Sequence, residues 1–239
     1  MIWWIIATFC AFFVKGLCGF ANTLVFTSIL SFGNNNVDIS PVELIVGYPT
    51  NAIIAWKERK SIKWNMCIPL SILVIAGSIP GTIFLKNANT TVIKIIFGFI
   101  IVAIGIEMLL RDLYLNKRGQ SKVVLAIIGI LSGLLCGLYG IGALLGSYVS
   151  RVTDDSHSFK ANICVVFMVE NTFRIVLYAL WGIITFEVFK QSVILIPIMI
   201  AGLALGLLIS KVLDENIAKK IVIVMLIVCG AALIINNVM

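Results

Sequence analysis

Four polar or ionisable side chains lie inside otherwise apolar stretches and could do chemistry there: Lys15, Glu170, Asn171 and Arg174. An ionisable group is costly in an apolar surrounding, and where one occurs it usually serves a function. Glu170 and Arg174 are four residues apart. They could form a buried salt bridge, or Arg174 could hold an anion while Glu170 exchanges a proton. Lys15 directly precedes a glycine-rich segment, which makes it, with Glu170, a candidate for coupling or gating.

Two asparagines and two glycine-rich segments complete the set of candidate binding residues. Asn51 and Asn171 are 120 residues apart and could face one central cavity, although hydrogen bonds between packed helices are the alternative. Backbone N–H groups that follow a helix break can bind a small oxyanion. The predicted substrate-binding residues are therefore Gly16, Gly19, Phe20, Asn22, Thr23, Asn51, Gly137, Gly140, Gly142, Asn171 and Arg174.

The sequence shows no pattern typical of a catalytic, metal-binding or phosphate-binding site. It contains no phosphate-binding loop, no metal-ligand spacing and no nucleophile beside a base, and its six cysteines form no C-x-x-C pair. We therefore expect no catalytic residue, no metal and no cofactor, and a protein that is not an enzyme. The segment Ser40-Pro41-Val42-Glu43 is typical of a helix start, with Ser40 as N-cap and Glu43 in a capping box, so Glu43 is interpreted as structural.

The elements that must position these residues are long apolar blocks. Of the 239 residues, 61% are hydrophobic and 12% are charged, whereas soluble domains have about 45–50% and about 25%. A helix of about 20 apolar residues crosses a bilayer, so the sequence predicts an all-α polytopic membrane protein with no separate soluble domain. The blocks run approximately over residues 2–32, 41–56, 66–85, 92–110, 122–150, 161–183, 191–210 and 217–236.

An internal repeat relates the two halves of the chain. The segment from Lys15 to Phe20 matches the segment from Cys136 to Ile141 at an offset of 121 residues. Gly77 and Gly81 match Gly202 and Gly206 at an offset of 125 residues. Such landmarks in one order predict two homologous four-segment repeats, residues 1–116 and 117–239, which together form one transmembrane domain.

The distribution of basic residues favours inverted repeats. The net charge is +7, and most Lys and Arg residues lie in short loops between the blocks, which argues against a nucleic-acid partner. With eight full crossings of the membrane, the loops place nine of these basic residues in the cytoplasm and seven outside. If the over-long first and fifth blocks turn back at their glycines, the division becomes thirteen inside against three outside. Because basic residues favour the cytoplasmic side, two re-entrant segments are predicted, although eight full spans stay open.

The paired breaks (Gly16-x-x-Gly19 and Gly137-x-x-Gly140-x-Gly142), the Asn171-x-x-Arg174 segment and the duplicated four-segment unit resemble the TauE/SafE family of sulfite exporters and toluenesulfonate permeases. The resemblance covers essentially the whole chain. It implies a multi-pass transporter in the cell membrane that moves sulfite, a sulfonate or a related sulfur-containing anion, coupled to protons. An anion channel with the same site, a membrane-embedded enzyme and a scaffold are the alternatives. The sequence leaves open the direction of transport and whether the protein forms a homodimer.

Overall fold

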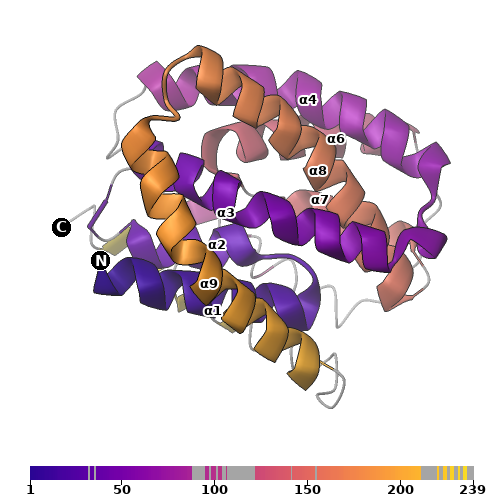
Figure 1. Ribbon diagram of the computed structural model, residues 1–239. Coiled ribbons are helices and arrows are strands. Elements are labelled where there is room, and N and C mark those ends of the chain that lie inside the picture. The colour runs from indigo at the N-terminus through magenta and orange to yellow at the C-terminus, as the bar shows by residue number, and fades with distance from the viewer. Residues whose placement is uncertain are drawn as a thin grey trace.

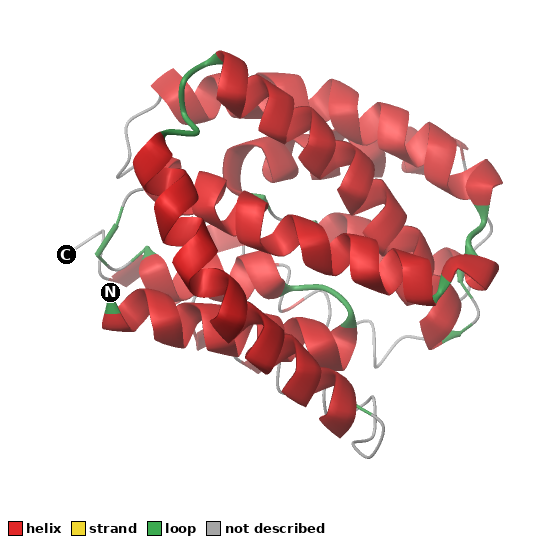
Figure 2. Ribbon diagram, viewed as in Figure 1, coloured by secondary structure: helices red, strands yellow, loops and turns green. Residues whose placement is uncertain are grey.

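In the computed structural model of the chain, all regular structure of the described residues is helical (Figure 2). The expected blocks 92–110 and 217–236 lie largely outside the described residues. The structure describes residues 1–31, 33–34, 36–87, 95–96, 98–100, 102–103, 106, 122–140, 142–153, 155–210, 220, 223–224, 227–228, 231 and 234–235.

Both over-long apolar blocks break at their glycines, as predicted. The first block forms α1 (Ile2–Cys18) and α2 (Asn22–Leu30). The fifth block forms α6 (Lys122–Tyr139) and α7 (Ala143–Val152). Gly19 and Gly140 end the longer helices with φ angles of 83° and 72°, in the left-handed region that favours glycine. Each block is therefore a helix of four to five turns followed by a short second helix.

The other described helices are α3 (Asn36–Lys57), α4 (Trp64–Asn87), α8 (Ser156–Leu180) and α9 (Phe186–Ile209). A short 3₁₀ turn, Arg59–Ser61, joins α3 to α4.

The predicted N-cap at Ser40 is wrong. The helix α3 already begins at Asn36, so Pro41 lies inside it. Asp38 lies in the first turn, where its negative charge complements the positive end of the helix dipole.

Among the described residues, three helical segments are long and apolar enough to cross a membrane, by length and composition: Trp64–Ile83, His157–Leu180 and Phe186–Ile209. Shorter apolar helices cover Ile2–Leu17 and Leu125–Leu138. The helix α4 exposes one stripe of large apolar side chains. Such a stripe suits contact with lipid, because exposing apolar side chains to water is unfavourable. The stripe consists of Ile68, Ile72, Ile79 and Ile83, each 43–62% exposed.

Close glycine contacts pair α1 with α9 and α4 with α6 (Figure 1). A Cβ atom on Gly16 of α1 would lie 2.7 Å from the Cα atom of Gly206 in α9. A Cβ atom on Gly81 of α4 would lie 3.1 Å from the Cα atom of Gly137 in α6. At these distances the helix backbones touch, which is the packing that small residues permit between membrane helices. Gly16 and Gly137 therefore serve close helix packing.

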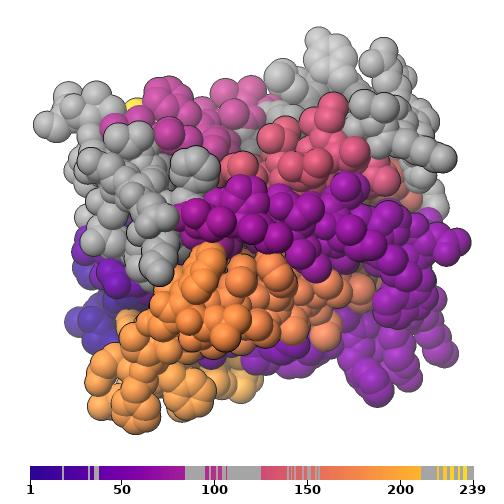
Figure 3. Space-filling view, turned by 90° about the horizontal axis from the view of Figure 1, so that it is seen from above, coloured from indigo at the N-terminus to yellow at the C-terminus, as the bar shows by residue number. Residues whose placement is uncertain are grey.

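The two pairs are joined through α3 and α8, which run antiparallel. The hydroxyl groups of Ser40 and Tyr178 are 3.2 Å apart near the start of α3 and the end of α8. At the opposite ends, Glu58 Oε2 and His157 Nδ1 are 2.9 Å apart. The end of α3 and the start of α8 therefore lie on the same side of the molecule. Figure 3 shows α3, in purple, crossing one face of the molecule beside α9, in orange.

Candidate anion site

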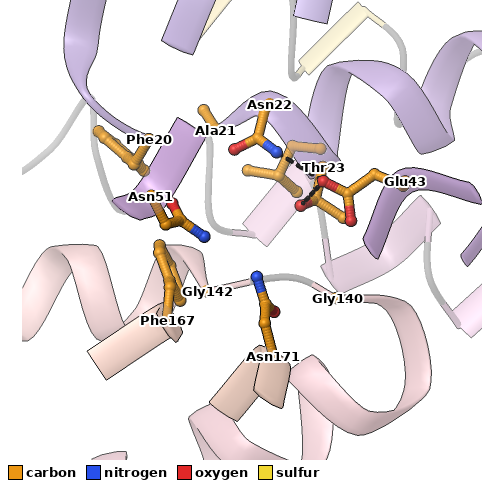
Figure 4. A pocket seen from close by; sticks show the side chains of 11 residues that line it. Phe20, Ala21, Asn22, Thr23, Glu43, Asn51, Gly140, Gly142, Phe167 and Asn171 are labelled. Atoms are coloured by element: carbon orange, nitrogen blue, oxygen red, sulfur yellow. Dashed lines mark hydrogen bonds between the residues drawn. The ribbon is translucent and has the colours of Figure 1, made fainter. Parts of the chain in front are cut away.

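The two helix breaks meet at one small cavity (Figure 4). Its volume is about 20 Å³, enough for about one water molecule. The wall combines residues of the first break and α2, the middle of α3, the second break, and α8. The lining residues are Phe20, Ala21, Asn22, Thr23, Leu24, Glu43, Asn51, Gly140, Gly142, Phe167 and Asn171.

Lys15 fixes which end of the Asn51 side chain faces the cavity. The Lys15 ammonium group donates a hydrogen bond of 2.6 Å from Nζ to Oδ1 of Asn51, and both residues are buried. An ammonium group has no acceptor, so the oxygen of the amide must face Lys15 and the NH₂ group must point away from it. Figure 4 shows the Asn51 nitrogen directed into the cavity.

Asn171 brings a second amide to the opposite side of the cavity. It lies on α8, and Figure 4 shows its nitrogen pointing toward the same space as the Asn51 nitrogen. Asn51 and Asn171, which are 120 residues apart in the sequence, therefore line one cavity, as the sequence predicted.

The first turns of the two short helices add backbone donors. The first hydrogen bond of α2 runs from the Val25 N–H group to the Ala21 carbonyl oxygen, and that of α7 from Gly146 to Gly142. The N–H groups of the residues between each pair precede those bonds and have no partner within their own helix. Asn22, Thr23 and Gly142 are in the cavity wall. The positive ends of both helix dipoles thus lie beside the cavity, a setting that favours an anion.

Glu43 is the acidic member of the wall, and sequence reasoning missed it. Its Oε1 atom accepts hydrogen bonds from Asn22 Nδ2, at 2.5 Å, and from Thr23 Oγ1, at 2.8 Å. The carboxyl group is buried, with 4% of the residue exposed. Glu43 therefore does not form the capping box that its position after Ser40-Pro41 suggested. It ties α3 to the first turn of α2.

Glu170 and Arg174 form a buried cluster next to the cavity and outside its lining. The Arg174 Nε atom is 3.7 Å from Glu170 Oε1, and both residues are 1% exposed. Arg174 Nη2 donates to the hydroxyl group of Ser40 at 2.7 Å, and Ser78 Oγ donates to Glu170 at 3.0 Å. The other terminal nitrogen of Arg174, Nη1, approaches the cavity wall at Gly140. Arg174 thus has polar partners within the protein, and its charge lies close to the cavity.

The remaining predicted glycines support the breaks without lining the cavity. Gly16 and Gly137 lie at the helix–helix contacts described above. Gly19 lies under the aliphatic part of the Lys160 side chain, whose Cγ atom would be 2.6 Å from an added Cβ atom. Phe167, which the sequence did not indicate, packs its ring against Gly142. Within an apolar helix, a single phenylalanine gives no signal of such a position.

Comparisons with known proteins identify the family. The sequence model of the family described as "Sulfite exporter TauE/SafE" matches residues 4–233. A curated protein of Cupriavidus necator, "Probable sulfite/organosulfonate exporter TauE", is 22% identical over 199 residues, which cover 82% of this chain and 77% of that protein. No solved structure matches the chain. Because the family match spans nearly all of its length, the chain belongs to the TauE/SafE sulfite exporter family, a family of multi-pass membrane transporters and not of enzymes.

Proposed function

We propose that this protein is a secondary transporter that moves sulfite or an organosulfonate across the membrane, coupled to protons, by alternating access around the cavity between the two helix breaks. One observation carries the proposal: two amide groups and the N-terminal ends of two short helices line a single cavity. Several fixed N–H donors suit an oxyanion. The curated relative is named as a sulfite/organosulfonate exporter.

The charge of Lys15 adds to the attraction for an anion. In the described part of the chain, its hydrogen-bond partner is the neutral amide of Asn51 and not a carboxylate. The ammonium group therefore acts through Asn51 on whatever occupies the cavity. Arg174 adds positive charge behind Gly140 and, because it does not line the cavity, acts on the anion at a distance.

The size of the cavity supports alternating access. A space of about 20 Å³ cannot hold an oxyanion with four heavy atoms unless its walls move apart. Because the walls come from both halves of the chain, a rocking motion of one half against the other would open the site.

The helix contacts support two repeats over residues 1–116 and 117–239. Exchanging α1 with α6, α2 with α7, α3 with α8 and α4 with α9 maps the contacts α4–α6, α1–α2, α4–α8 and α2–α3 onto α1–α9, α6–α7, α3–α9 and α7–α8, and it maps α3–α8 onto itself. The same holds for single residues: Gly202 lies against the carbonyl oxygen of Phe9, and Gly77 lies against that of Ile130. The two glycines are 125 residues apart, and Phe9 and Ile130 are 121 apart, which are the offsets of the sequence repeat.

The antiparallel packing of α3 and α8 supports inverted repeats. These helices occupy equivalent places in the two halves, so parallel repeats would make them point the same way. The contact between Glu58 and His157 instead brings the 57–63 loop and the start of α8 to one side. Eight full spans would separate them by the membrane, whereas two re-entrant segments place both in the cytoplasm with most basic residues.

Flux measurements in proteoliposomes test the proposed function. Purified protein would be reconstituted, and uptake of sulfite, sulfate, thiosulfate, taurine and sulfoacetate measured with and without a pH gradient. We expect saturable flux of sulfite or a sulfonate that responds to the gradient. The variants Asn51→Leu and Asn171→Leu should each lose most of this flux, whereas Asn65→Leu, at an exposed position on α4, should keep it.

Three outcomes would oppose the proposal. Flux that neither saturates nor depends on the proton gradient would favour an anion channel. No movement of any of these anions would exclude the proposed transport. Normal flux in both cavity asparagine variants would remove the cavity from the pathway.

A further inference from the structure

The two oxygens of the Glu43 carboxyl group have different surroundings. Oε1 accepts the hydrogen bonds from Asn22 and Thr23. Oε2 receives no hydrogen bond from the described part of the chain, and it would lie 3.5 Å from a Cβ atom on Gly140. One oxygen is thus held in place by two donors, while the other is available at the cavity wall. A proton on Oε2 would leave both hydrogen bonds to Oε1 intact, because a protonated carboxyl group still accepts through its other oxygen.

Charged side chains from several helices face Glu43. Lys15 on α1 and Arg174 on α8 attract its negative charge, and Glu170 on α8 and the Cys136 thiol on α6 lie within electrostatic range. With both carboxylates ionised, their charges balance those of Lys15 and Arg174. A proton on Glu43 leaves the cluster with an excess positive charge, and repulsion between Glu43 and an incoming anion disappears.

Glu170 is less suited than Glu43 to exchange a proton with an anion in the cavity. Its side chain is committed to Ser78 and Arg174, and it does not line the cavity. Protonating it would break a buried ion pair, and it would present no hydrogen-bond donor to an anion.

We infer that Glu43 is the coupling residue: it takes up a proton on Oε2 when the anion enters the cavity, and it releases that proton when the anion leaves. The inference rests on the proposed function. It assigns the proton to one atom, because Oε1 already accepts two hydrogen bonds and Oε2 lies beside Gly140 in the cavity wall. The protonated Oε2 atom can then donate a hydrogen bond to the anion, where the ionised carboxylate would repel it.

Sulfite binding to purified protein at several pH values tests the assignment. Binding coupled to one proton weakens about tenfold for each pH unit above the proton's midpoint. We expect this slope, with net proton uptake in weakly buffered solution, for the wild type. E43Q mimics the protonated state and should bind sulfite without that slope and without the matching proton uptake. Sulfite's own titration contributes equally to all variants. The matched control is E170Q, a second buried carboxylate outside the lining, which should keep the wild-type slope.

A second variant covers the case in which E43Q fails to fold. T23V removes one hydrogen bond to Oε1, which disfavours the ionised carboxylate. The binding profile should therefore shift by about one unit to higher pH. An unshifted profile in T23V, or an E43Q protein that keeps the wild-type slope and proton uptake, would overturn the assignment and leave the transport proposal standing. Absence of sulfite binding by the wild type at any pH would overturn both.

Discussion

The ammonium group of Lys15 and the side-chain amide of Asn51 are joined by a buried hydrogen bond of 2.6 Å, between residues on α1 and α3. Lys15 is 1% exposed, and this partner carries no charge. A buried cation with a neutral partner is unusual, because desolvation of the charge is then poorly compensated. Glu43 lies within electrostatic range of Lys15, and an anion in the cavity would add a second negative charge, with Asn51 between it and the ammonium group.

The first prediction follows from this relationship. Lys15→Met should weaken sulfite binding by at least about tenfold, because it removes a charged hydrogen bond that orients Asn51. The melting temperature should change little, because the variant loses one hydrogen bond to a neutral partner but no longer buries a charge. Binding and thermal unfolding of the purified protein measure the two effects. Lys190→Met, at an exposed position on α9, is the control. Equal binding by both variants would show that Lys15 has only a structural role.

A second prediction uses two glycines with nearly the same backbone conformation. Gly140 and Gly182 have φ angles of 72° and 69°. Alanine at either position should cost about 1 kcal/mol of stability through left-handed strain. A Cβ atom on Gly140 would also lie 2.8 Å from Thr23 and 3.1 Å from Arg174, whereas no atom lies within 4 Å at Gly182. Gly140→Ala should therefore abolish transport, whereas Gly182→Ala should retain it. The two variants should have similar melting temperatures. Normal flux in Gly140→Ala would place the anion path elsewhere.

The third prediction concerns the ion pair beside the cavity. Arg174→Gln leaves the buried Glu170 without its partner, which should cost about 3–5 kcal/mol of stability. The double variant Glu170→Gln/Arg174→Gln removes both charges and should regain much of this loss. Chemical and thermal unfolding in detergent would compare the stability of the wild type, the single variant and the double variant. If the single variant melts like the wild type and only its sulfite affinity falls, Arg174 is a direct ligand of the anion, as the sequence first suggested.

Much of the architecture could be predicted from the sequence because it rests on local patterns. Block length and glycine spacing predicted both helix breaks, since a continuous helix of thirty residues exceeds the bilayer thickness. The repeat offset predicted that Asn51 and Asn171 would line one cavity. These features depend on segment length and on matching sequence patterns in the two halves, which a single sequence records.

Glu43 could not be predicted in the same way. A serine, a proline and a glutamate at capping-box spacing are typical of a helix start, yet α3 begins earlier, at Asn36. Whether a helix extends beyond such a motif depends on tertiary packing, which overrides local preference. The pairing of Lys15 with Asn51 is equally hidden, because the residues are 36 positions apart and lie on different helices.

The last prediction tests the inverted topology. In a variant with all six cysteines replaced, a single cysteine would be introduced at His157, at the start of α8, or at Glu187, at the start of α9. His157 is 72% exposed at its side chain and contacts Glu58 next to the basic loop, so a thiol-reactive reagent can reach position 157 from that side. Two re-entrant segments place this side in the cytoplasm and the start of α9 outside. A membrane-impermeant reagent should therefore label Glu187→Cys in intact cells, and it should label His157→Cys only after the cells are opened. Labelling of His157→Cys in intact cells would contradict the inverted arrangement, and labelling of both positions from one side would contradict a membrane-spanning α8.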